Sequence, residues 1–137
     1  DNAIQDLAQG LLTCHARYTT KKPVHSRKRD LAIERIVDYL NSNPATASNV
    51  DRLCQIARVS ERTLQYAFRE RFGIPPNTFI KRWKLNSARH MLIRSNPSTQ
   101  TIAEVCTQLG FQHPSLFAQD YKHLFAELPS QTLARKK

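Results

Sequence analysis

The sequence lacks the residue patterns that disulfide frameworks, metal sites and membrane spans require. Its three cysteines, Cys14, Cys54 and Cys106, are far apart, and there is neither a C-x-x-C motif nor a histidine at metal-ligand spacing. No apolar stretch approaches the roughly 20 residues of a transmembrane helix, and no secretory signal is present. We therefore expect free thiols, no metal or other cofactor, and a soluble protein in a reducing cytoplasm.

Acidic residues are also scarce. The 137 residues include 11 Asp and Glu against 21 Lys and Arg, which gives a formal net charge of +10 and a sequence pI near 10.0. A polyanion is the natural partner of such a chain, although a solvated basic surface would give the same totals. The chain can bury one or two small cores. It shows no nucleophile, metal-ligand or phosphate-loop constellation, so we expect that it is not an enzyme.

The first 29 residues differ from the rest. Residues 2–18 place apolar side chains at helical spacing and predict an amphipathic helix. Residues 19–29 combine Pro23 with five Lys or Arg and predict a basic linker, with an arm along a DNA backbone as the alternative. The chain begins at Asp1 rather than Met, which suggests a piece of something longer or a processed chain.

The remaining residues have helical periodicity without a strand signal, so the predicted fold class is all-α. A first helix is expected from Asp30 to about Asn43, and a short one after a near capping box of Ser48 and Asp51. Ser60 is the expected N-cap of a helix that ends at Gly73. Further helices are expected at 77–94, from a Thr101–Glu104 capping box to Gly110, from Pro114 with His113 as N-cap to Phe125, and briefly after Pro129.

One pattern occurs twice. Residues 50–76 and 102–129 carry the same short helix, turn and second helix, at an offset of 52 residues that becomes 53 after one extra residue in the second turn. This is the pattern of a helix-turn-helix, in which the second helix enters the major groove of DNA. Two copies in a basic chain favour sequence-specific binding to double-stranded DNA.

Each second helix divides into an inward and an outward face. The predicted inward stripes are Leu64, Ala67, Phe68 and Phe72 in the first copy, and Phe117, Tyr121, Leu124 and Phe125 in the second. The side chains left outward are Arg62, Gln65, Tyr66 and Arg69, and then Ser115, Leu116, Gln119 and Lys122. Outward polar residues near a helix N-terminus are those that can reach base edges.

Two spaced motifs make the sequence resemble the DNA-binding domain of the AraC/XylS family of bacterial transcription regulators. They are F-I-x-x-W-K-L-x-x-A-x-x-M-L over residues 79–92 and I-A-E-V-C-x-x-L-G-F-x-x-x-S-x-F-x-x-x-Y-K over residues 102–122. The resemblance covers about residues 31–133. It implies about seven helices in two subdomains joined by a linker helix at 77–94, so we expect a DNA-binding domain at 30–137, with helix-turn-helix units at 49–73 and 101–126, after a connector at 1–29.

The resemblance also implies which side chains meet the bases. By position these are Arg62, Gln65 and Tyr66 in the first recognition helix, and Ser115, Leu116 and Gln119 in the second. Arg pairs with guanine, Gln with adenine, and Leu can touch a thymine methyl. Positions 66 and 119 often hold Arg in the family, so Tyr66 and Gln119 put the usual guanine contacts there in doubt.

Contacts to the DNA backbone are expected from cationic side chains and from helix N-termini. Arg69 and Lys122 occupy equivalent repeat positions, which favours phosphate contacts over the alternative that both are simply solvated. The full expected set is Thr63, Arg69, Asn77, Lys81, Lys122 and Ser130.

These features together predict a transcription regulator that reads a bipartite promoter site with two recognition helices in successive major grooves. We expect it to activate transcription with RNA polymerase as a partner, and an effector or dimerisation domain to lie upstream of Asp1. The resemblance also implies that it acts in a bacterial cytoplasm, associated with the nucleoid. The first recognition helix, richer in cationic and polar side chains, is expected to dominate. The alternative is a basic nucleic-acid-binding protein that does not read sequence.

Overall fold

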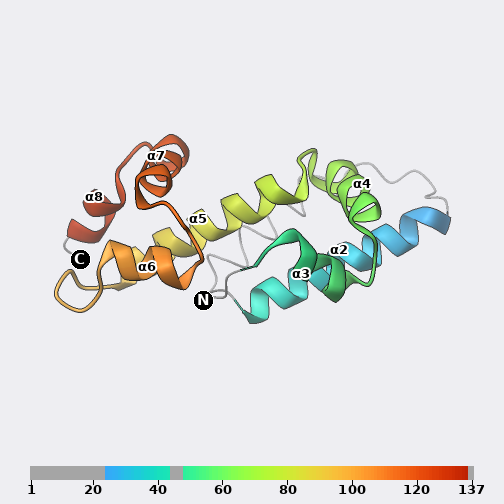
Figure 1. Cartoon of the computed structure of the whole chain (residues 1–137), viewed down its shortest axis with the longest axis horizontal. Helices are drawn as coiled ribbons and strands as arrows, with labels where there is room; N and C mark the ends of the chain where they lie inside the picture. The colour runs from blue at the N-terminus through green and yellow to red at the C-terminus, as the bar shows by residue number, and fades with distance from the viewer. Residues whose placement is uncertain (1–23, 44–47, 136–137) are drawn as a thin grey trace. The chain divides into compact units, whose positions relative to one another are not determined.

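The computed structural model describes residues 24–43 and 48–135, and all of its regular elements are helices (Figure 1). The predicted all-α class is therefore confirmed. The predicted helix at 2–18 lies outside the described residues, as does Cys14. No described helix is long and apolar enough to cross a membrane. The helices are α2 (Val24–Ser42), α3 (Val50–Ala57), α4 (Glu61–Phe72), α5 (Pro76–Arg94), α6 (Ile102–Gln108), α7 (Pro114–Phe125) and α8 (Pro129–Ala134).

The described chain forms two compact units that divide within α5, between Ile80 and Lys81. The first unit contains α2, α3, α4 and the beginning of α5. The second contains the rest of α5 with α6, α7 and α8. Each unit thus holds one of the two predicted helix-turn-helix copies, together with the part of α5 that completes its core.

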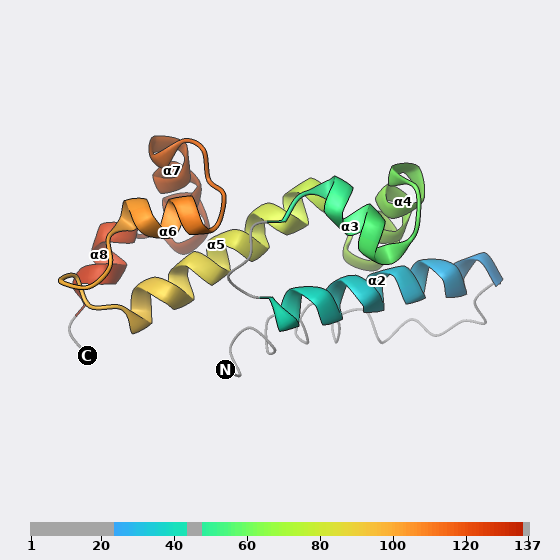
Figure 2. The ribbon, with the colours of Figure 1, turned by 60° about the horizontal axis from the view of Figure 1, so that its bottom comes forward.

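The core of the first unit forms where α2 lies along α3 and α4 (Figure 2). The end of this core toward α5 is aromatic: the ring of Phe79 lies 5.1 Å from Phe68 and 4.8 Å from Phe72 between centroids. The beginning of α5 is therefore part of the first unit's core. The buried apolar side chains of this unit are Ala32, Ile33, Ile36, Leu40, Leu53, Ala57, Leu64, Ala67, Phe68, Pro76, Phe79 and Ile80.

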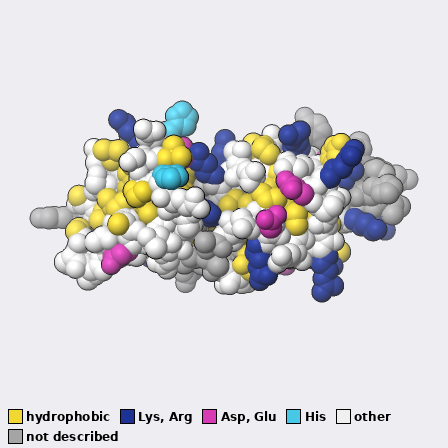
Figure 3. Space-filling view, in the orientation of Figure 1, with side chains coloured by type: hydrophobic (Ala, Val, Ile, Leu, Met, Phe, Trp, Pro, Cys, Tyr) yellow, Lys and Arg dark blue, Asp and Glu magenta, His cyan; other side chains and the backbone are white. Residues whose placement is uncertain are grey.

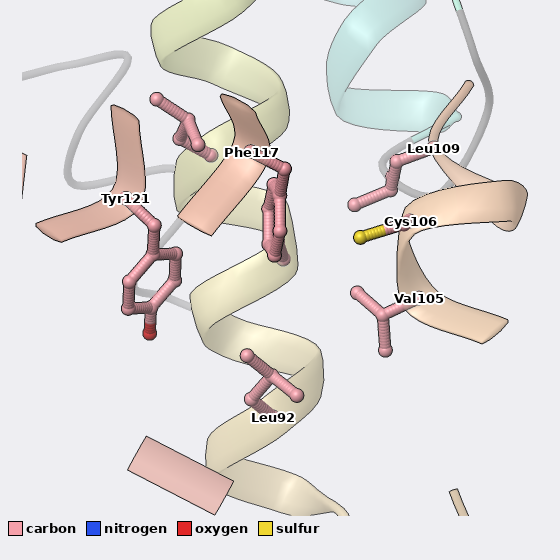
Figure 4. Close-up of a cluster of buried hydrophobic side chains, with 8 residues drawn as sticks. Leu92, Val105, Cys106, Leu109, Phe117 and Tyr121 are labelled. Atoms are coloured by element: carbon pink, nitrogen blue, oxygen red, sulfur yellow. The ribbon is translucent and has the colours of Figure 1, made fainter. Parts of the chain in front are cut away.

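The core of the second unit gathers around the later turns of α5, with α6 and α7 packed against it (Figure 4). The members are Leu85, Ala88 and Leu92 of α5, Val105 and Cys106 of α6, Leu109, and Phe117 and Tyr121 of α7. The Phe117 and Tyr121 side chains point from α7 toward this centre, as the predicted inward stripe requires.

Most predicted helix ends are confirmed by their caps. The Ser60 hydroxyl accepts the backbone N–H of Thr63, and Gly73 ends α4 in the left-handed region at φ 71°. Thr101 and Glu104 form the reciprocal capping box of α6. His113 is the N-cap residue of α7, although its side chain makes no capping hydrogen bond.

The predicted basic linker at 19–29 is wrong for its last six residues, because α2 begins at Val24 rather than Asp30. Arg and Lys are good helix formers, and Pro is compatible with a helix start, so the segment after Pro23 continues the helical periodicity. The Arg29 side chain also pairs with Glu70 of α4, with 2.9 Å between Nη1 and Oε2. A tertiary contact thus holds the beginning of α2, although its composition alone predicts a solvated linker.

Two smaller predictions are also wrong. The N-cap of α3 is Asn49, whose side-chain oxygen accepts the Arg52 N–H at 2.9 Å, while Ser48 is buried one residue earlier. Asn caps as well as Ser, and here its backbone has the extended conformation of a cap. Leu124 was expected in the inward stripe of α7 but is 40% exposed. Its repeat counterpart is Arg71, so this position lies at the rim of the stripe.

Candidate nucleic-acid interface

The turn between α3 and α4 fixes the start of α4, the first predicted recognition helix. Arg58 adopts the left-handed conformation at φ 56°, and its backbone N–H bonds the carbonyl of Cys54. The Arg35 guanidinium of α2 donates to the Ala57 carbonyl at 3.2 Å, which satisfies an acceptor at the end of α3. Ser60 then caps α4. Two features of the turn, at Arg58 and Ser60, and one contact from α2 therefore hold the N-terminus of α4 in place.

The outward face of α4 has the expected exposed side chains. Arg62 is exposed, Tyr66 is 52% exposed, and Gln65 is only partly exposed. The Arg62 guanidinium carbon lies 5.9 Å from the centroid of the Tyr66 ring. Arg62 and Tyr66 are therefore the better-placed of the three predicted base readers, and they already contact one another.

A side chain that the sequence reasoning missed joins this face from α2. The Arg29 guanidinium carbon lies 5.7 Å from the centroid of the Tyr66 ring, and Arg29 is paired with Glu70. The missed signal is the absence of Pro and Gly from residues 24–42, which allows α2 to begin early. Spacing along the chain could not have revealed the contact, because Arg29 and Glu70 are 41 residues apart.

The second recognition helix, α7, follows a different turn. Gly110 supplies the left-handed corner at φ 73°, at the repeat position that Arg58 occupies in the first copy. Pro114 then starts the helix, where its missing N–H costs no hydrogen bond. Ser115, Leu116 and Gln119 are all exposed, with Leu116 at 51%. The three predicted base readers of α7 thus lie on its free face.

The packing of α8 against α7 depends on a buried polar network. The Glu127 carboxylate accepts a hydrogen bond from the Thr132 hydroxyl at 2.7 Å, and Thr132 is 2.7 Å from the Tyr121 hydroxyl. Arg89 of α5 approaches the same carboxylate at 3.5 Å, and Arg135 pairs with its other oxygen. Burial raises the pKa of Tyr121 above its ordinary value. This network fixes the short helix that carries Ser130.

The predicted phosphate contacts differ in how free their side chains are. Arg69, Asn77, Lys122 and Ser130 are exposed. The Thr63 hydroxyl lies 3.0 Å from that of Ser60, and the Lys81 ammonium is paired with Asp120 of α7 at 2.7 Å. Thr63 and Lys81 would have to share or exchange these partners to bind phosphate.

The two described cysteines are part of the packing. Burial raises the pKa of the Cys106 thiol, and burial together with Glu61 and Asp51 raises the pKa of the Cys54 thiol. A raised pKa keeps a thiol protonated and a weak nucleophile. Within residues 24–43 and 48–135, no group of three or more His, Cys, Asp or Glu side chains could hold a metal ion.

The exposed charge matches a polyanionic partner better than a small-molecule site. The face drawn in Figure 3 shows more Lys and Arg side chains (dark blue) than Asp and Glu side chains (magenta). Both recognition helices also have basic residues in their last turns: Arg69 and Arg71 in α4, and Lys122 and His123 in α7. Cations at this end of a helix complement its dipole, so part of their role is structural.

Comparisons with known proteins agree with this geometry. A family model described as a helix-turn-helix domain matches residues 53–135. The XylDLEGF operon transcriptional activator 3 of Pseudomonas putida is 33% identical over 106 residues, covering 77% of this chain and 32% of its own. The XylDLEGF operon transcriptional activator 2 of the same organism is 36% identical over 106 residues, covering 76% of this chain and 66% of its own.

A solved structure has the same architecture. It is described as a probable AraC family transcriptional regulator from Rhodopseudomonas palustris CGA009, with a TM-score of 0.62 at 28% identity, and the match covers 74% of this chain and 94% of the other. The chain spans about a third of the length of the first of the curated relatives above. The match therefore concerns one domain of such proteins.

Proposed function

The chain belongs to the AraC/XylS family of helix-turn-helix transcription regulators and is a DNA-binding domain of that family, and on this premise we propose that it reads a bipartite, non-palindromic promoter site. The observation that carries the proposal is the division of α4 and α7. Each buries one apolar stripe in its own unit and leaves side chains exposed at its N-terminal half, which are polar apart from Leu116. That is the arrangement of a major-groove recognition helix.

The proposed base readers keep the roles expected from their chemistry. Arg62 and Gln65 hydrogen-bond guanine and adenine, while Tyr66 adds a hydroxyl beside them. On α7, Leu116 contacts a thymine methyl, and Ser115 and Gln119 hydrogen-bond base edges. The two exposed sets differ, so the two half-sites should differ in sequence, and the half-site read by α4 should contribute more affinity.

The proposed phosphate contacts surround these faces. Exposed cations bind phosphate without reading sequence, and helix N-termini add free N–H donors. The first turn of α5 contains no acidic residue that would oppose an anion at Asn77. The proposed set is Thr63, Arg69, Asn77, Lys81, Lys122 and Ser130.

Reading both half-sites also has a cost. Successive major grooves on one face of a duplex are about 34 Å apart. If the linker helix does not bend, contact by both recognition helices bends the duplex, at a cost on the order of 1–6 kcal/mol, or leaves one helix with weaker base contacts. Measurement of the bend by circular permutation of the site in a gel assay distinguishes these outcomes.

The test begins with selection of bound duplexes from a random pool by the full chain. We expect two short sequence blocks about one helical turn apart. In a gel-shift titration on the selected site, Arg62→Ala should weaken binding about 10-fold through one block only, because a bidentate Arg–guanine pair contributes about 1–3 kcal/mol. Gln119→Ala should act through the other block, with a smaller loss.

Arg52→Ala is the matched control for Arg62→Ala. It removes the same side chain from the same unit, but Arg52 faces Gln55 and the Tyr39 ring of α2 rather than α4. Affinity for the selected site should therefore change little. If the pool yields no preferred sequence and Arg62→Ala weakens all duplexes equally, the chain is a basic nucleic-acid-binding protein without sequence readout, and the proposal is wrong.

We also propose that the protein activates transcription by contact with RNA polymerase, and that an effector or dimerisation domain lies upstream of Asp1. The relatives named as operon activators support the first part. The second part is supported by the XylDLEGF operon transcriptional activator 3, because the match covers only 32% of that protein. Transcription in vitro from a promoter carrying the selected site tests activation. A transcript level that falls or stays constant as the protein is added would contradict it.

A further inference from the structure

The N-terminal turns of α2 contact the recognition helix through one side chain. Arg29 donates to Glu70 with 2.9 Å between Nη1 and Oε2, and its guanidinium carbon lies 5.7 Å from the centroid of the Tyr66 ring. Arg62, one turn before Tyr66, has its guanidinium carbon 5.9 Å from the same centroid. Tyr66 is thus engaged by two guanidinium groups from two different helices.

The four residues form one line across the exposed face. Arg62, Tyr66 and Glu70 follow one another at intervals of four along α4, so they share one side of that helix. Arg29 reaches the last two from α2 and connects them. Because half of the Tyr66 side chain remains exposed, the contacts restrict the ring without covering it.

An exposed tyrosine without such contacts would change rotamer freely, and ordering it on DNA would cost conformational entropy. A ring already in contact with two guanidinium groups loses less conformational entropy on binding, and its hydroxyl is presented in a restricted set of positions. The two cations also stay close to the negative surface of the partner. The geometry therefore favours an indirect role for Arg29 in base reading.

We propose that Arg29 is a positioning residue for the recognition face of α4. Held by Glu70, it restricts the Tyr66 ring and so sets the base preference where Tyr66 meets the DNA. The proposal rests on the proposed function, because it requires that α4 reads bases. It extends the reading unit of the first half-site to α2, a helix outside the helix-turn-helix itself.

The test uses the full chain and a duplex panel in which every base pair of the selected first half-site is changed in turn. The variants are Arg29→Ala, Tyr66→Ala and the double variant. Arg29→Ala should reduce discrimination about 3- to 10-fold at the base pairs where Tyr66→Ala also reduces it, and nowhere else. In the Tyr66→Ala background, the loss of Arg29 should have little further effect.

Three variants separate positioning from charge and from folding. Lys28→Ala removes one exposed cation from the adjacent position and should leave the base preferences unchanged. Glu70→Gln removes the carboxylate that holds Arg29 and should reproduce part of the Arg29→Ala pattern. Arg29→Lys keeps the positive charge but replaces the planar guanidinium by an ammonium group, and it should restore part of the discrimination between bases. This variant keeps the test informative if Arg29→Ala folds poorly.

One pattern would overturn the proposal. In that pattern, Arg29→Ala weakens binding to every duplex of the panel by the same factor, and equally in the Tyr66→Ala background. The slope of log Kd against log salt concentration also falls by about one, as expected for the loss of one phosphate contact. Arg29 would then contact phosphate directly. If the wild-type chain itself shows no preference across the panel, the proposed function has failed instead. The two failures are therefore distinguishable.

Discussion

Replacement of Glu127 should destabilise the second unit more than replacement of any exposed glutamate. Glu127 is only 9% exposed, and its two carboxylate oxygens serve Thr132, Arg89 and Arg135. Gln has nearly the same shape and can still accept from Thr132, but it loses the charge that both arginines face. Ala removes all three interactions and leaves a small cavity.

The expected magnitudes follow from the exposure of the partners. The Arg135 side chain is 67% exposed, so its pair with Glu127 contributes about 0.5 kcal/mol; the Arg89 side chain is 30% exposed and contributes about 1 kcal/mol. Glu127→Gln should therefore lower the free energy of unfolding by about 1.5 kcal/mol. Glu127→Ala also deprives the buried Thr132 hydroxyl of its best acceptor, for a total of about 3 kcal/mol.

Urea unfolding followed by circular dichroism and by the fluorescence of Trp83, the single tryptophan, measures both values. In Glu127→Gln the thermal midpoint of the second unit, which has fewer than about 100 residues, should fall by roughly 10 °C. Glu34→Gln, the same change at an exposed glutamate of α2, is the control and should alter stability by less than about 0.5 kcal/mol. If Glu127→Gln matched the control, the network would not be what holds α8, and the reasoning would be refuted.

Four further substitutions have expected outcomes. Ala126 ends α7 at φ 59° where Gly73 ends α4 at φ 71°, so Ala126→Gly should stabilise and Gly73→Ala should destabilise the protein, each by about 1 kcal/mol in urea unfolding; an opposite sign for either would contradict the left-handed strain. The backbone N–H of Thr101 lowers the pKa of Glu104, so the folded value lies below the ordinary 4.5. The stabilisation by Glu104 is therefore complete above the ordinary pKa of 4.5 and is lost as the pH falls through the folded pKa. Glu104→Ala should reduce the fall of the thermal midpoint at acidic pH. Burial raises the pKa of Tyr121 above 10.0, so its stabilisation is present below pH 10 and lost above it; Tyr121→Phe should weaken the alkaline loss of stability, and an unchanged profile would exclude Tyr121 as its source.

Local chemistry explains why much of the fold could be predicted from the sequence. Ser60, Gly73 and the Thr101–Glu104 pair act within one turn of chain, so their residue types suffice to place the helix ends. The spacing of apolar residues also predicts which faces of α4 and α7 are buried, apart from Leu124, which is exposed at the edge of the buried stripe of α7. Asn49 shows the limit of such signals, because it and Ser48 are equally good caps and only the packing chooses between them.

The candidate site was predictable to the same extent and no further. Which side chains of α4 and α7 face outward follows from helical periodicity, and the exposure of Arg62, Tyr66 and Leu116 agrees with it. The participation of Arg29 depends on a contact with α4 across 41 residues, which no local pattern encodes. The many Lys and Arg residues at 19–29 favoured a linker there, so the contact of Arg29 was not expected. The contacts of these residues with DNA stay a prediction.

The helices of each unit follow one another along the chain, with three residues between α3 and α4, five between α6 and α7, and three between α7 and α8. Short loops close at little entropic cost, so we expect low contact order and folding in microseconds to milliseconds. The Glu127 network joins α8 to α5 and α7, whose buried core cluster with α6 contains no residue of α8, so we expect the network to form after the transition state. Its removal should then accelerate unfolding and leave the refolding rate almost unchanged, which makes the last helix a determinant of how long the folded second unit survives rather than how fast it forms.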